Sequence, residues 1–375
     1  MIDKIRTLLG LNTYQPLNLI EVSEERLLTN LRFLSSLSPK IKIAPVLKSN
    51  AYGHGLINVA KVLDSQNCPF FCVDSIYEAY ELLKARIKSP ILIMGYINPN
   101  NLKVKKLPFS FALWSLELAE SINKYQPSSP VHLFVDTGMH REGVQLEDLP
   151  EFLIQLKKYS NLKIEGIMSH LASVKNAKDP LYLSQLKNFE KALEVCKREG
   201  IKPKWIHLAN SDGLLNSDLK KLSKISNLAR VGLNLYGVSE SENLKPALTF
   251  KTRIVQIKRI SKGGKVGYDG TFSIPSDMLI GILPAGYNDG IDRRLSNKGF
   301  VKVQEKFCPI IGRVSMNLCI INLSQVKNPQ VGQEVIIFSQ DPDDKNSIIK
   351  SASITGKIPY ELLVQLNPST KRLAI

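Results

Sequence analysis

Charged and hydroxyl side chains recur in this sequence where short apolar stretches end. Lys48 follows the mostly apolar stretch IAPVL and opens the glycine-rich segment KSNAYGHG. A lysine amine that is removed from water has a lowered pKa and becomes a nucleophile able to form a Schiff base. Other apolar stretches end in further candidates of this kind. These are Arg141, His170, His207 with Ser211, and Arg230 with Gly232.

These groups can meet only if the apolar stretches are strands that end at one edge. From about residue 41 onward, such stretches alternate with segments in which apolar residues recur every three or four positions, which is typical of parallel strands linked by helices. Eight such units predict an α/β fold, a closed (β/α)8 TIM-type barrel, with an open doubly wound sheet as the main alternative. The predicted strands are residues 41–47, 70–73, 90–94, 110–114, 131–136, 163–169, 204–208 and 228–231.

In such a barrel, the loops that follow the strands converge on one rim, where functional groups collect. Taken singly, Lys48 has an ordinary explanation as a solvated strand end, and a histidine is more often a structural core residue. Their coincidence on one rim favours function. The loops after the seventh and eighth strands commonly hold a phosphate through backbone N–H groups and a hydroxyl, and Ser211, Gly232 and Leu233 are placed for this. A Schiff-base lysine, an arginine for a ring nitrogen and a phosphate site together indicate pyridoxal phosphate.

The pattern changes after about residue 246. Segments such as TFKTRIVQIKRI and FVKVQEKFCPIIGRV alternate apolar and polar residues, with Gly, Pro and Asn between them. This alternation predicts a mostly antiparallel β domain. Since 375 residues exceed the usual span of one hydrophobic core, we predict two domains, a barrel over residues 1–245 and a β domain over residues 246–375.

The composition bounds the class of protein. The net charge of +16 arises from 50 Lys and Arg against 34 Asp and Glu, but the basic residues are scattered along predicted helices, which favours a solvated surface over a nucleic-acid site. Five cysteines without a CxxC pair indicate a reducing compartment and no metal cluster. No apolar run approaches the ~20 residues of a bilayer span, and the N-terminus lacks the pattern of a signal peptide. We therefore expect a cytoplasmic protein without nucleic-acid or membrane partners.

The chain resembles the alanine racemase family, bacterial pyridoxal-phosphate enzymes that make D-alanine for cell-wall peptidoglycan. The resemblance runs from about residue 15 to residue 365 and rests on the joint order of several blocks. It implies an isomerase that interconverts L-alanine and D-alanine by a two-base proton transfer at Cα of a pyridoxal-phosphate aldimine, with a broader-specificity racemase acting on serine as the alternative. The blocks are VLKSNAYGHG, VDTGMHREG, HLANS, ARVGLNLYG, GYDGTF, PAGYNDG and IGRVSMN.

Carried over by matching motif, Lys48 binds the cofactor and then acts as one acid–base group, and Tyr268 of the β domain acts as the other. Two bases suit racemisation because a proton leaves one face of Cα and arrives on the opposite face. To bring a tyrosine pKa from about 10 to ~7.5 requires roughly 3.4 kcal/mol of stabilisation of the phenolate. The resemblance indicates His170 and Arg230 as sources of the positive charge that supplies it.

The resemblance also assigns the cofactor and substrate contacts. Arg230 faces the pyridine nitrogen, Arg141 contacts the ring oxygen and the substrate, and the backbone N–H of Met316 binds the substrate carboxylate. In the family the tyrosine reaches the site from the partner subunit, which implies a head-to-tail homodimer with shared sites. The implied cofactor-binding set is Lys48, Tyr52, Arg141, His170, Ser211, Arg230, Gly232 and Leu233, and the implied substrate entrance is Tyr287, Arg293 and Arg313.

Three positions depart from the family pattern. Phe134 stands where many members have a lysine, often carbamylated, so Arg141 must be positioned in another way. Asn317 replaces the usual aspartate after Met316, and Pro368 stands where many members have a phosphate-binding tyrosine that narrows the pocket. These departures predict a roomier site with measurable turnover of serine.

Several rival functions share part of this pattern. A racemase for a larger amino acid, a decarboxylase, or a D-amino-acid lyase can use a related barrel, but Tyr268 argues against a decarboxylase and the lack of a His/Cys cluster argues against a metal-aided lyase. A non-catalytic cofactor carrier needs the barrel alone, without the β domain. A nucleic-acid binder is the weakest alternative.

Overall fold

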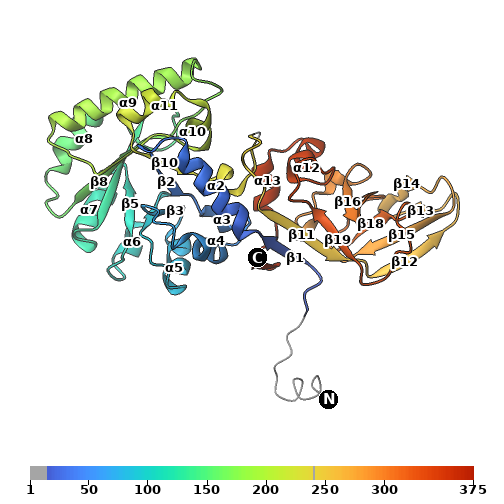
Figure 1. The fold of residues 1–375 in the computed structure, drawn as a ribbon. Coiled ribbons are helices and arrows are strands. Elements are labelled where there is room, and N and C mark those ends of the chain that lie inside the picture. Colours follow the sequence, from blue (N-terminus) through green and yellow to red (C-terminus); the bar gives the residue numbers. More distant parts are fainter. Residues whose placement is uncertain (1–14, 240) are drawn as a thin grey trace. The chain divides into compact units, whose positions relative to one another are not determined.

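The computed structural model of the chain describes residues 15–239 and 241–375, which form two compact units (Figure 1). One unit consists of Ser23–Ala247. The other combines Leu248–Leu373 with the N-terminal segment that ends at Val22.

The first unit is a nearly closed barrel of eight parallel strands, as predicted. Strand β10 pairs with β2 on one side, and a single bridge between Val46 and Cys72 links the β2 side to β3, so the sheet returns on itself. The order around the sheet is β2-β10-β9-β8-β6-β5-β4-β3, which excludes an open doubly wound sheet. The strands are β2 Lys42–Pro45, β3 Phe71–Val73, β4 Ile91–Ile93, β5 Ser110–Leu113, β6 Pro130–Asp136, β8 Lys163–Met168, β9 Trp205–His207 and β10 Leu228–Val231, and the short β7 Val144–Gln145 pairs with β6.

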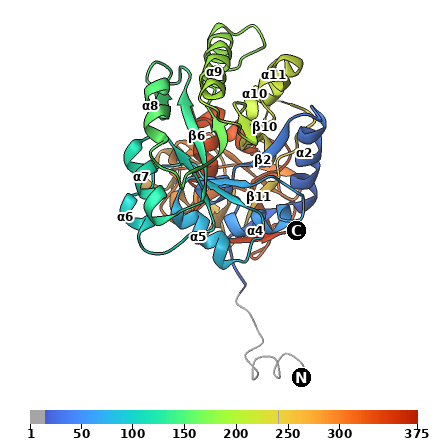
Figure 2. The ribbon, with the colours of Figure 1, turned by 90° about the vertical axis from the view of Figure 1, so that its left-hand side faces the viewer.

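Helices surround these strands, as the view toward the barrel shows (Figure 2). Serine at the end of a strand starts several of them: Ser75 and Ser115 follow β3 and β5 closely, and each accepts a hydrogen bond from a backbone N–H of the first turn. The helices are α2 Glu24–Ser36, α4 Leu56–Leu63, α5 Ile76–Lys84, α6 Pro99–Leu102, α7 Leu116–Tyr125, α8 Leu149–Leu156, α9 Pro180–Arg198, α10 Ser211–Asn216 and α11 Leu219–Ile225. A further short element, α3 Lys48–Tyr52, winds in the left-handed sense over most of its length.

Burial on both faces explains why several predicted strands read as continuous apolar runs. Every residue of β3, β4 and β5 is buried. One cluster inside the barrel brings together residues from strands far apart in the sequence. Its buried members are Ala44, Val46, Phe70, Cys72, Leu92 and Leu228.

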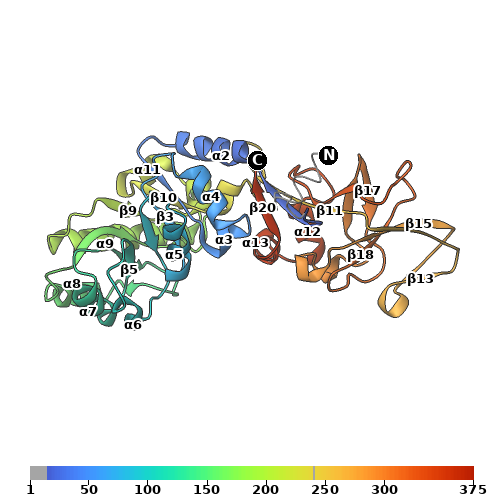
Figure 3. The same ribbon diagram turned by 90° about the horizontal axis from the view of Figure 1, so that it is seen from below.

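The second unit is built from antiparallel sheets, again as predicted (Figure 3). A six-stranded sheet has the order β17-β16-β19-β11-β1-β20, and the first strand of the chain, β1, pairs with β11 inside it. The remaining strands form a three-stranded sheet, β12-β15-β18, and a hairpin, β13-β14. The strands are β1 Leu19–Val22, β11 Leu248–Arg253, β12 Gln256–Ile260, β13 Lys265–Val266, β14 Phe272–Ser273, β15 Met278–Leu283, β16 Phe300–Val303, β17 Lys306–Pro309, β18 Cys319–Asn322, β19 Glu334–Phe338 and β20 Lys371–Ala374.

Two helices in this unit were not predicted from the sequence. These are α12 Ile348–Thr355, which starts at the N-cap Ser347, and α13 Pro359–Val364, which starts with a proline in its first turn. Within the described ranges, none of the helices has the length and apolar character needed to cross a bilayer.

Candidate active site

Lys48 lies just beyond the carboxyl end of β2, where the sequence predicts it. Its Nζ lies 3.4 Å from Oδ1 of Asp74, which follows β3, and its side chain is 36% exposed. The register between β2 and β10 pairs Val231 with Pro45, and the backbone N–H of Val46 donates to the Val231 carbonyl. The loop after β10 therefore starts beside the strand that carries Lys48.

A small cradle lies at this rim. The backbone N–H of Gly232 donates to the buried Ser211 hydroxyl over 3.2 Å, and a Cβ added at Gly232 would come 2.5 Å from the Tyr52 hydroxyl. Only glycine fits there without displacing Tyr52. The structure thus brings together Ser211, Gly232 and Tyr52, three of the residues predicted to hold a phosphate, and their hydroxyl and backbone N–H groups fit a phosphate oxygen.

Arg230 lies at the centre of a buried polar network. Its guanidinium donates to the carbonyl oxygens of His207 and Ser169, over 2.8 Å and 2.6 Å. It also reaches two imidazole nitrogens, Nδ1 of His207 at 2.8 Å and Nδ1 of His170 at 3.2 Å. His207 in turn contacts His132, with 2.8 Å between Nε2 and Nδ1.

A guanidinium has no acceptor, so it fixes the tautomer of each histidine in this chain. Nδ1 of His207 accepts from Arg230, which leaves the proton on Nε2 to be donated to Nδ1 of His132. Nδ1 of His170 accepts from Arg230 in the same way, so its proton lies on Nε2. The outer nitrogen of His132 then carries a proton that finds no hydrogen-bond partner among the described residues, with Glu165 Oε2 at 3.9 Å.

Burial keeps these histidines uncharged. It lowers the pKa of His132 and His170 to about 3, with the Arg230 charge as a further cause, and it lowers the pKa of His207 well below the ordinary value. Burial also lowers the pKa of Arg230, to about 10, which leaves the guanidinium protonated near neutral pH. The expectation that His170 contributes positive charge is therefore corrected: the cation of this pair is Arg230.

Arg141 lies near the same rim, in the loop after β6. Its Nε donates to Glu142 Oε2 over 2.5 Å. The positive charge of Arg141 also lowers the pKa of His170, although burial and the charge of Arg230 lower it more. Position 134 holds a phenylalanine, so no lysine at this position can position Arg141. Phe134 packs edge-on against Trp114, with 6.0 Å between ring centres, beside Met168. Glu142, rather than a group at position 134, is the partner of the arginine.

The second unit carries Tyr268 at the start of a short 3-10 turn, Tyr268–Gly270. The side chain is 68% exposed. Gly267 before it has φ +70° and Asp269 after it has φ +58°, which brings the chain sharply around Tyr268. The Arg313 guanidinium holds this turn through an ion pair with Asp269, 3.0 Å from Oδ2.

A cavity of about 640 Å³ opens beside Tyr268 in this unit. Tyr287, Arg293 and Met316 line it, whereas Arg313, predicted with Tyr287 and Arg293 to line an entrance, contacts the Tyr268 turn instead. The carbonyl oxygen of Met316 accepts from Asn288, while its backbone N–H has no acceptor among the residues that the structure describes. Asn317 next to it is exposed.

Four residues in or near the barrel rim that carries Lys48 and Arg230 were not predicted as site residues. His132, Asp74 and Glu78 were not considered, and His207 was noted only as a rim group. His132 is the polar member of the apolar strand VHLFV, and its inward position follows only once the barrel is closed. Glu78 has a local signal, because Ser75 and Glu78 have the Ser-x-x-Glu spacing of a capping box.

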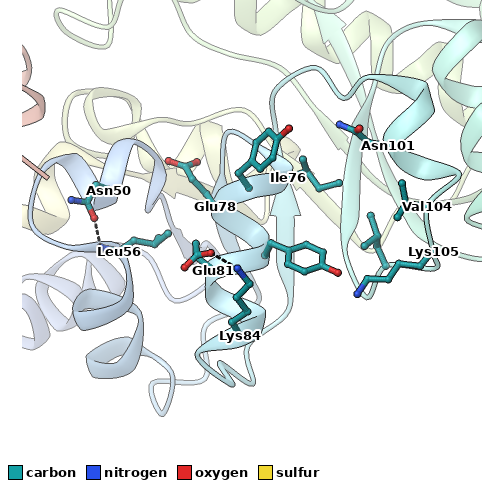
Figure 4. Close-up of a pocket in the computed structure, with 12 residues that line it drawn as sticks. Asn50, Leu56, Ile76, Glu78, Glu81, Lys84, Asn101, Val104 and Lys105 are labelled. Atoms are coloured by element: carbon teal, nitrogen blue, oxygen red, sulfur yellow. Dashed lines mark hydrogen bonds and ion pairs between the residues drawn. The ribbon is translucent and has the colours of Figure 1, made fainter. Parts of the chain in front are cut away.

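The barrel has another cavity of about 550 Å³ on its flank (Figure 4). Asn50, Leu56 and Glu78 line it, together with other side chains of α5 and side chains of residues 101–107. None of the residues predicted to hold the cofactor takes part, so this cavity is distinct from the rim around Lys48.

Comparison with known protein families matches almost the whole described chain. Residues 22–240 match the family described as "Alanine racemase, N-terminal domain", and residues 247–374 match "Alanine racemase, C-terminal domain". The chain is 36% identical over 357 residues to the alanine racemase of Borreliella burgdorferi, covering 92% of this chain and 93% of that one. It is 34% identical over 364 residues to the alanine racemase of Lactobacillus acidophilus, covering 91% and 92%.

Solved structures give the same result. The alanine racemase of Bacillus anthracis with bound L-Ala-P superposes with a TM-score of 0.88 at 27% identity, covering 97% of this chain and 96% of that one. The alanine racemase of Bartonella henselae with covalently bound pyridoxal phosphate superposes with a TM-score of 0.84 at 26% identity, covering 96% and 100%.

Proposed function

Because the chain belongs to the alanine racemase family, we propose that Lys48 and Tyr268 are the acid–base groups with which it interconverts L-alanine and D-alanine. The reaction is an isomerisation in which a proton leaves one face of Cα and returns on the other. One group on each face suits this requirement. The amine of Lys48 and the phenol of Tyr268, carried by different units of the chain, are the candidates.

The cofactor we propose is pyridoxal phosphate, which when bound withdraws electrons from the substrate and makes its Cα–H acidic. Lys48 is the residue that holds it covalently. Tyr52, Ser211, Gly232 and Leu233 hold its phosphate, and the fit of the first three at one rim supports this.

Arg230 faces the ring nitrogen in this proposal, with His170 and Arg141 beside the ring. A guanidinium donates a hydrogen bond without giving up its proton, so it leaves a ring nitrogen largely unprotonated. That restrains charge delocalisation into the ring and favours prompt return of the proton to Cα. The four hydrogen bonds that Arg230 donates to Ser169, His170 and His207 hold it rigidly for this role.

The substrate carboxylate is bound by Arg141 and the backbone N–H of Met316, and Tyr287 and Arg293 guide it in. Arg313, which the resemblance also implies at the entrance, holds the turn that carries Tyr268. The observation that carries the proposal is that Lys48 and the Arg230–Gly232 segment leave neighbouring strands at the same rim. One lysine, one arginine and a phosphate cradle are thereby combined in the way this cofactor requires.

The test follows L-alanine in deuterated water in the presence of pyridoxal phosphate. We expect loss of optical activity together with one deuterium at Cα of the D-alanine formed, and borohydride reduction should attach the pyridoxyl group to Lys48, as found by peptide mass spectrometry. Lys48→Ala should abolish both results, whereas Lys42→Ala, which removes an exposed lysine at the start of β2, should abolish neither. Decarboxylation, or a label on another lysine, contradicts the proposal.

Tyr268→Phe separates the two acid–base roles. Without the phenol, racemisation should fall at least 100-fold, in keeping with the size of general acid–base effects. The enantiomer whose Cα–H faces Lys48 should still exchange that hydrogen with solvent, without conversion to the other enantiomer. If both enantiomers still exchange their Cα hydrogen in Tyr268→Phe, Lys48 serves both faces and the role proposed for Tyr268 fails.

We also propose the finer organisation that the family implies. The predicted domain of residues 1–245 binds the cofactor and the predicted domain of residues 246–375 supplies the tyrosine, in a head-to-tail homodimer where each Tyr268 serves the partner's Lys48. Strand β1 pairs with β11, so the segment that ends at Val22 belongs to the second unit rather than to the barrel. The D-alanine formed would feed peptidoglycan synthesis in the cytoplasm.

A second substrate, serine, is favoured by Pro368. This exposed proline has no hydroxyl for the phosphate and leaves room where many relatives carry a tyrosine. We expect measurable racemisation of serine beside alanine in the same assay, and a lower serine-to-alanine ratio in Pro368→Tyr. Absolute selectivity for alanine in the unaltered chain would exclude a roomier site.

A further inference from the structure

The turn that follows Lys48 has an unusual backbone. Ser49, Asn50, Ala51 and Tyr52 have φ values of 55°, 55°, 53° and 51°, so four consecutive residues with a Cβ adopt the left-handed helical conformation. L-residues disfavour this conformation because Cβ approaches the following carbonyl oxygen. A run of such residues persists only when surrounding groups hold it.

One carboxylate holds the start of this turn. Glu78 Oε1 accepts from the backbone N–H of Ser49 over 2.6 Å, and Glu78 Oε2 accepts from the backbone N–H of Asp74 over 2.9 Å. These two N–H groups belong to the segments that leave β2 and β3, between which the only described strand pairing is the bridge Val46–Cys72. Glu78 therefore ties together two strand ends that the sheet joins weakly.

Both of these strand ends lie next to the Lys48 side chain. Ser49 follows Lys48 directly, and Asp74 carries the carboxylate that lies 3.4 Å from Nζ of Lys48. Within the turn, the Asn50 side chain accepts from the backbone N–H of Leu56, the first residue of α4, over 2.8 Å (Figure 4). Asn50 thus ties the turn to α4, and at the end next to Lys48 the charged acceptor is Glu78.

We propose that Glu78 is a positioning residue for the racemase: it holds the left-handed turn and Asp74 in place, and through them directs the Lys48 amine toward the rim. The structural part of this proposal stands on the hydrogen bonds alone. Its catalytic consequence rests on the function proposed for Lys48.

Glu78 also has an ordinary role, which the test must separate. It is the third residue of α5 and forms a capping box with Ser75, whose hydroxyl accepts from the backbone N–H of Glu78 over 3.3 Å. If capping is its only role, loss of the carboxylate should loosen the first turn of α5 and leave the Lys48 turn intact.

The variants are Glu78→Gln and Glu78→Ala, with two controls on the same helix. Ser75→Ala removes the other half of the capping box and leaves the Glu78 carboxylate in place. Glu81→Gln removes an exposed carboxylate whose partner is Lys84 on the helix surface. Glu78→Gln keeps one acceptor oxygen, so its exchange rate and its kcat should lie between those of the unaltered chain and those of Glu78→Ala.

Hydrogen–deuterium exchange of the full-length protein without added cofactor gives the first readout. In Glu78→Ala we expect the peptide over residues 47–56 to exchange at least about tenfold faster, because hydrogen bonds to a charged acceptor are among the stronger ones. Both controls should leave that peptide unchanged. Exchange that is faster only in residues 75–79, as in Ser75→Ala, would overturn the proposal.

Activity gives the second readout. We expect Glu78→Ala to weaken pyridoxal-phosphate binding and to lower kcat about tenfold or more, with a smaller change in the KM for alanine and partial recovery in Glu78→Gln. Should Lys48 prove not to be the site of borohydride labelling, the proposed function fails while the exchange result still stands. Should the label be found at Lys48 and kcat be unchanged in Glu78→Ala, the positioning role fails alone.

Discussion

Arg230 controls the protonation of the groups around it because its guanidinium only donates hydrogen bonds. It makes acceptors of Nδ1 in both His170 and His207, and the proton pattern passes on to His132. The same charge, together with burial, keeps these imidazoles neutral. The result is one buried cation surrounded by neutral acceptors, which firmly supports the guanidinium that we propose faces the cofactor ring.

Removal of that cation should be costly. In Arg230→Gln, the carbonyl oxygens of Ser169 and His207 lose their donor in a buried site, so we expect the free energy of unfolding to fall by about 3–5 kcal/mol. Racemisation should fall at least 100-fold. Arg230→Lys, which keeps the charge and loses the fork of donors, should be intermediate.

Urea denaturation and initial rates measure these effects. Arg198→Gln, at the exposed end of α9, is the control and should change stability by less than about 0.5 kcal/mol. If Arg230→Gln is as stable and active as that control, the network around Arg230 does not carry the role given to it.

At the scale of elements, β8 is shaped around a histidine of its neighbour β6. The register pairs Gly166 with His132, and a Cβ at Gly166 would come 2.3 Å from His132 Nδ1, the atom that contacts His207. The strand therefore uses glycine where the barrel interior must admit an imidazole. This close approach couples the packing of two strands to the position of Arg230.

A double-mutant cycle tests that coupling. Gly166→Ala should destabilise the protein by about 2–4 kcal/mol and reduce activity, because His132 must move. In His132→Ala, the added methyl group has room, so the cost of Gly166→Ala should fall by more than about 1 kcal/mol.

The control is Gly200→Ala, where a Cβ meets no atom within 4 Å and only the φ of +79° opposes it. Its cost should be the same with either residue at position 132. Strict additivity of Gly166→Ala and His132→Ala would show that the close contact is relieved elsewhere.

At the scale of the whole molecule, buried neutral histidines make stability depend on pH. The pKa of His132 and His170 is about 3 in the folded chain, against 6.5 for an ordinary histidine. Between these values the unfolded chain binds protons that the folded chain does not, so their contribution is fully present above pH 6.5 and is lost as the pH falls toward 3. Each such histidine contributes a slope of about 1.4 kcal/mol per pH unit.

We expect urea midpoints to fall steeply from pH 6.5 to pH 4.5. His132→Gln should remove about one proton from the slope. If His132→Gln does not alter the slope, His132 is protonated in the folded, unaltered protein over this pH range.

The proposed homodimer predicts complementation between inactive chains. When Lys48→Ala and Tyr268→Phe chains are mixed, a heterodimer with shared sites has one complete site and one that lacks both groups. Random pairing should then restore about a quarter of the unaltered activity, because half of the dimers are mixed and each has one of two sites intact. Activity that stays near zero despite heterodimers detected by native mass spectrometry would place both groups of a site in one chain.

The amino-acid sequence was enough to predict the alternation of strands and helices in the barrel, the antiparallel pattern after residue 246 and the strand-end positions of Lys48 and Arg230. These features depend on local periodicity, which can be recognised from residues that are close together in the sequence. The short helices α12 and α13 were missed because a segment of six to eight residues gives too little periodicity to separate it from loops. The pairing of β1 with β11 was missed because the partners are more than 200 residues apart.

Which polar groups contact one another depends on the folded barrel and could not be predicted from the sequence. Closing the barrel brings His132 of β6 against His207 of β9, and His207 against Arg230 of β10. Burial inside the barrel, which no local sequence pattern encodes, determines which of these side chains is charged. The Glu78 carboxylate reaches Ser49 across 29 positions of sequence only because their strands are neighbours. A side chain's type is written in the sequence, but its solvent, its partners and therefore its pKa are properties of the folded chain.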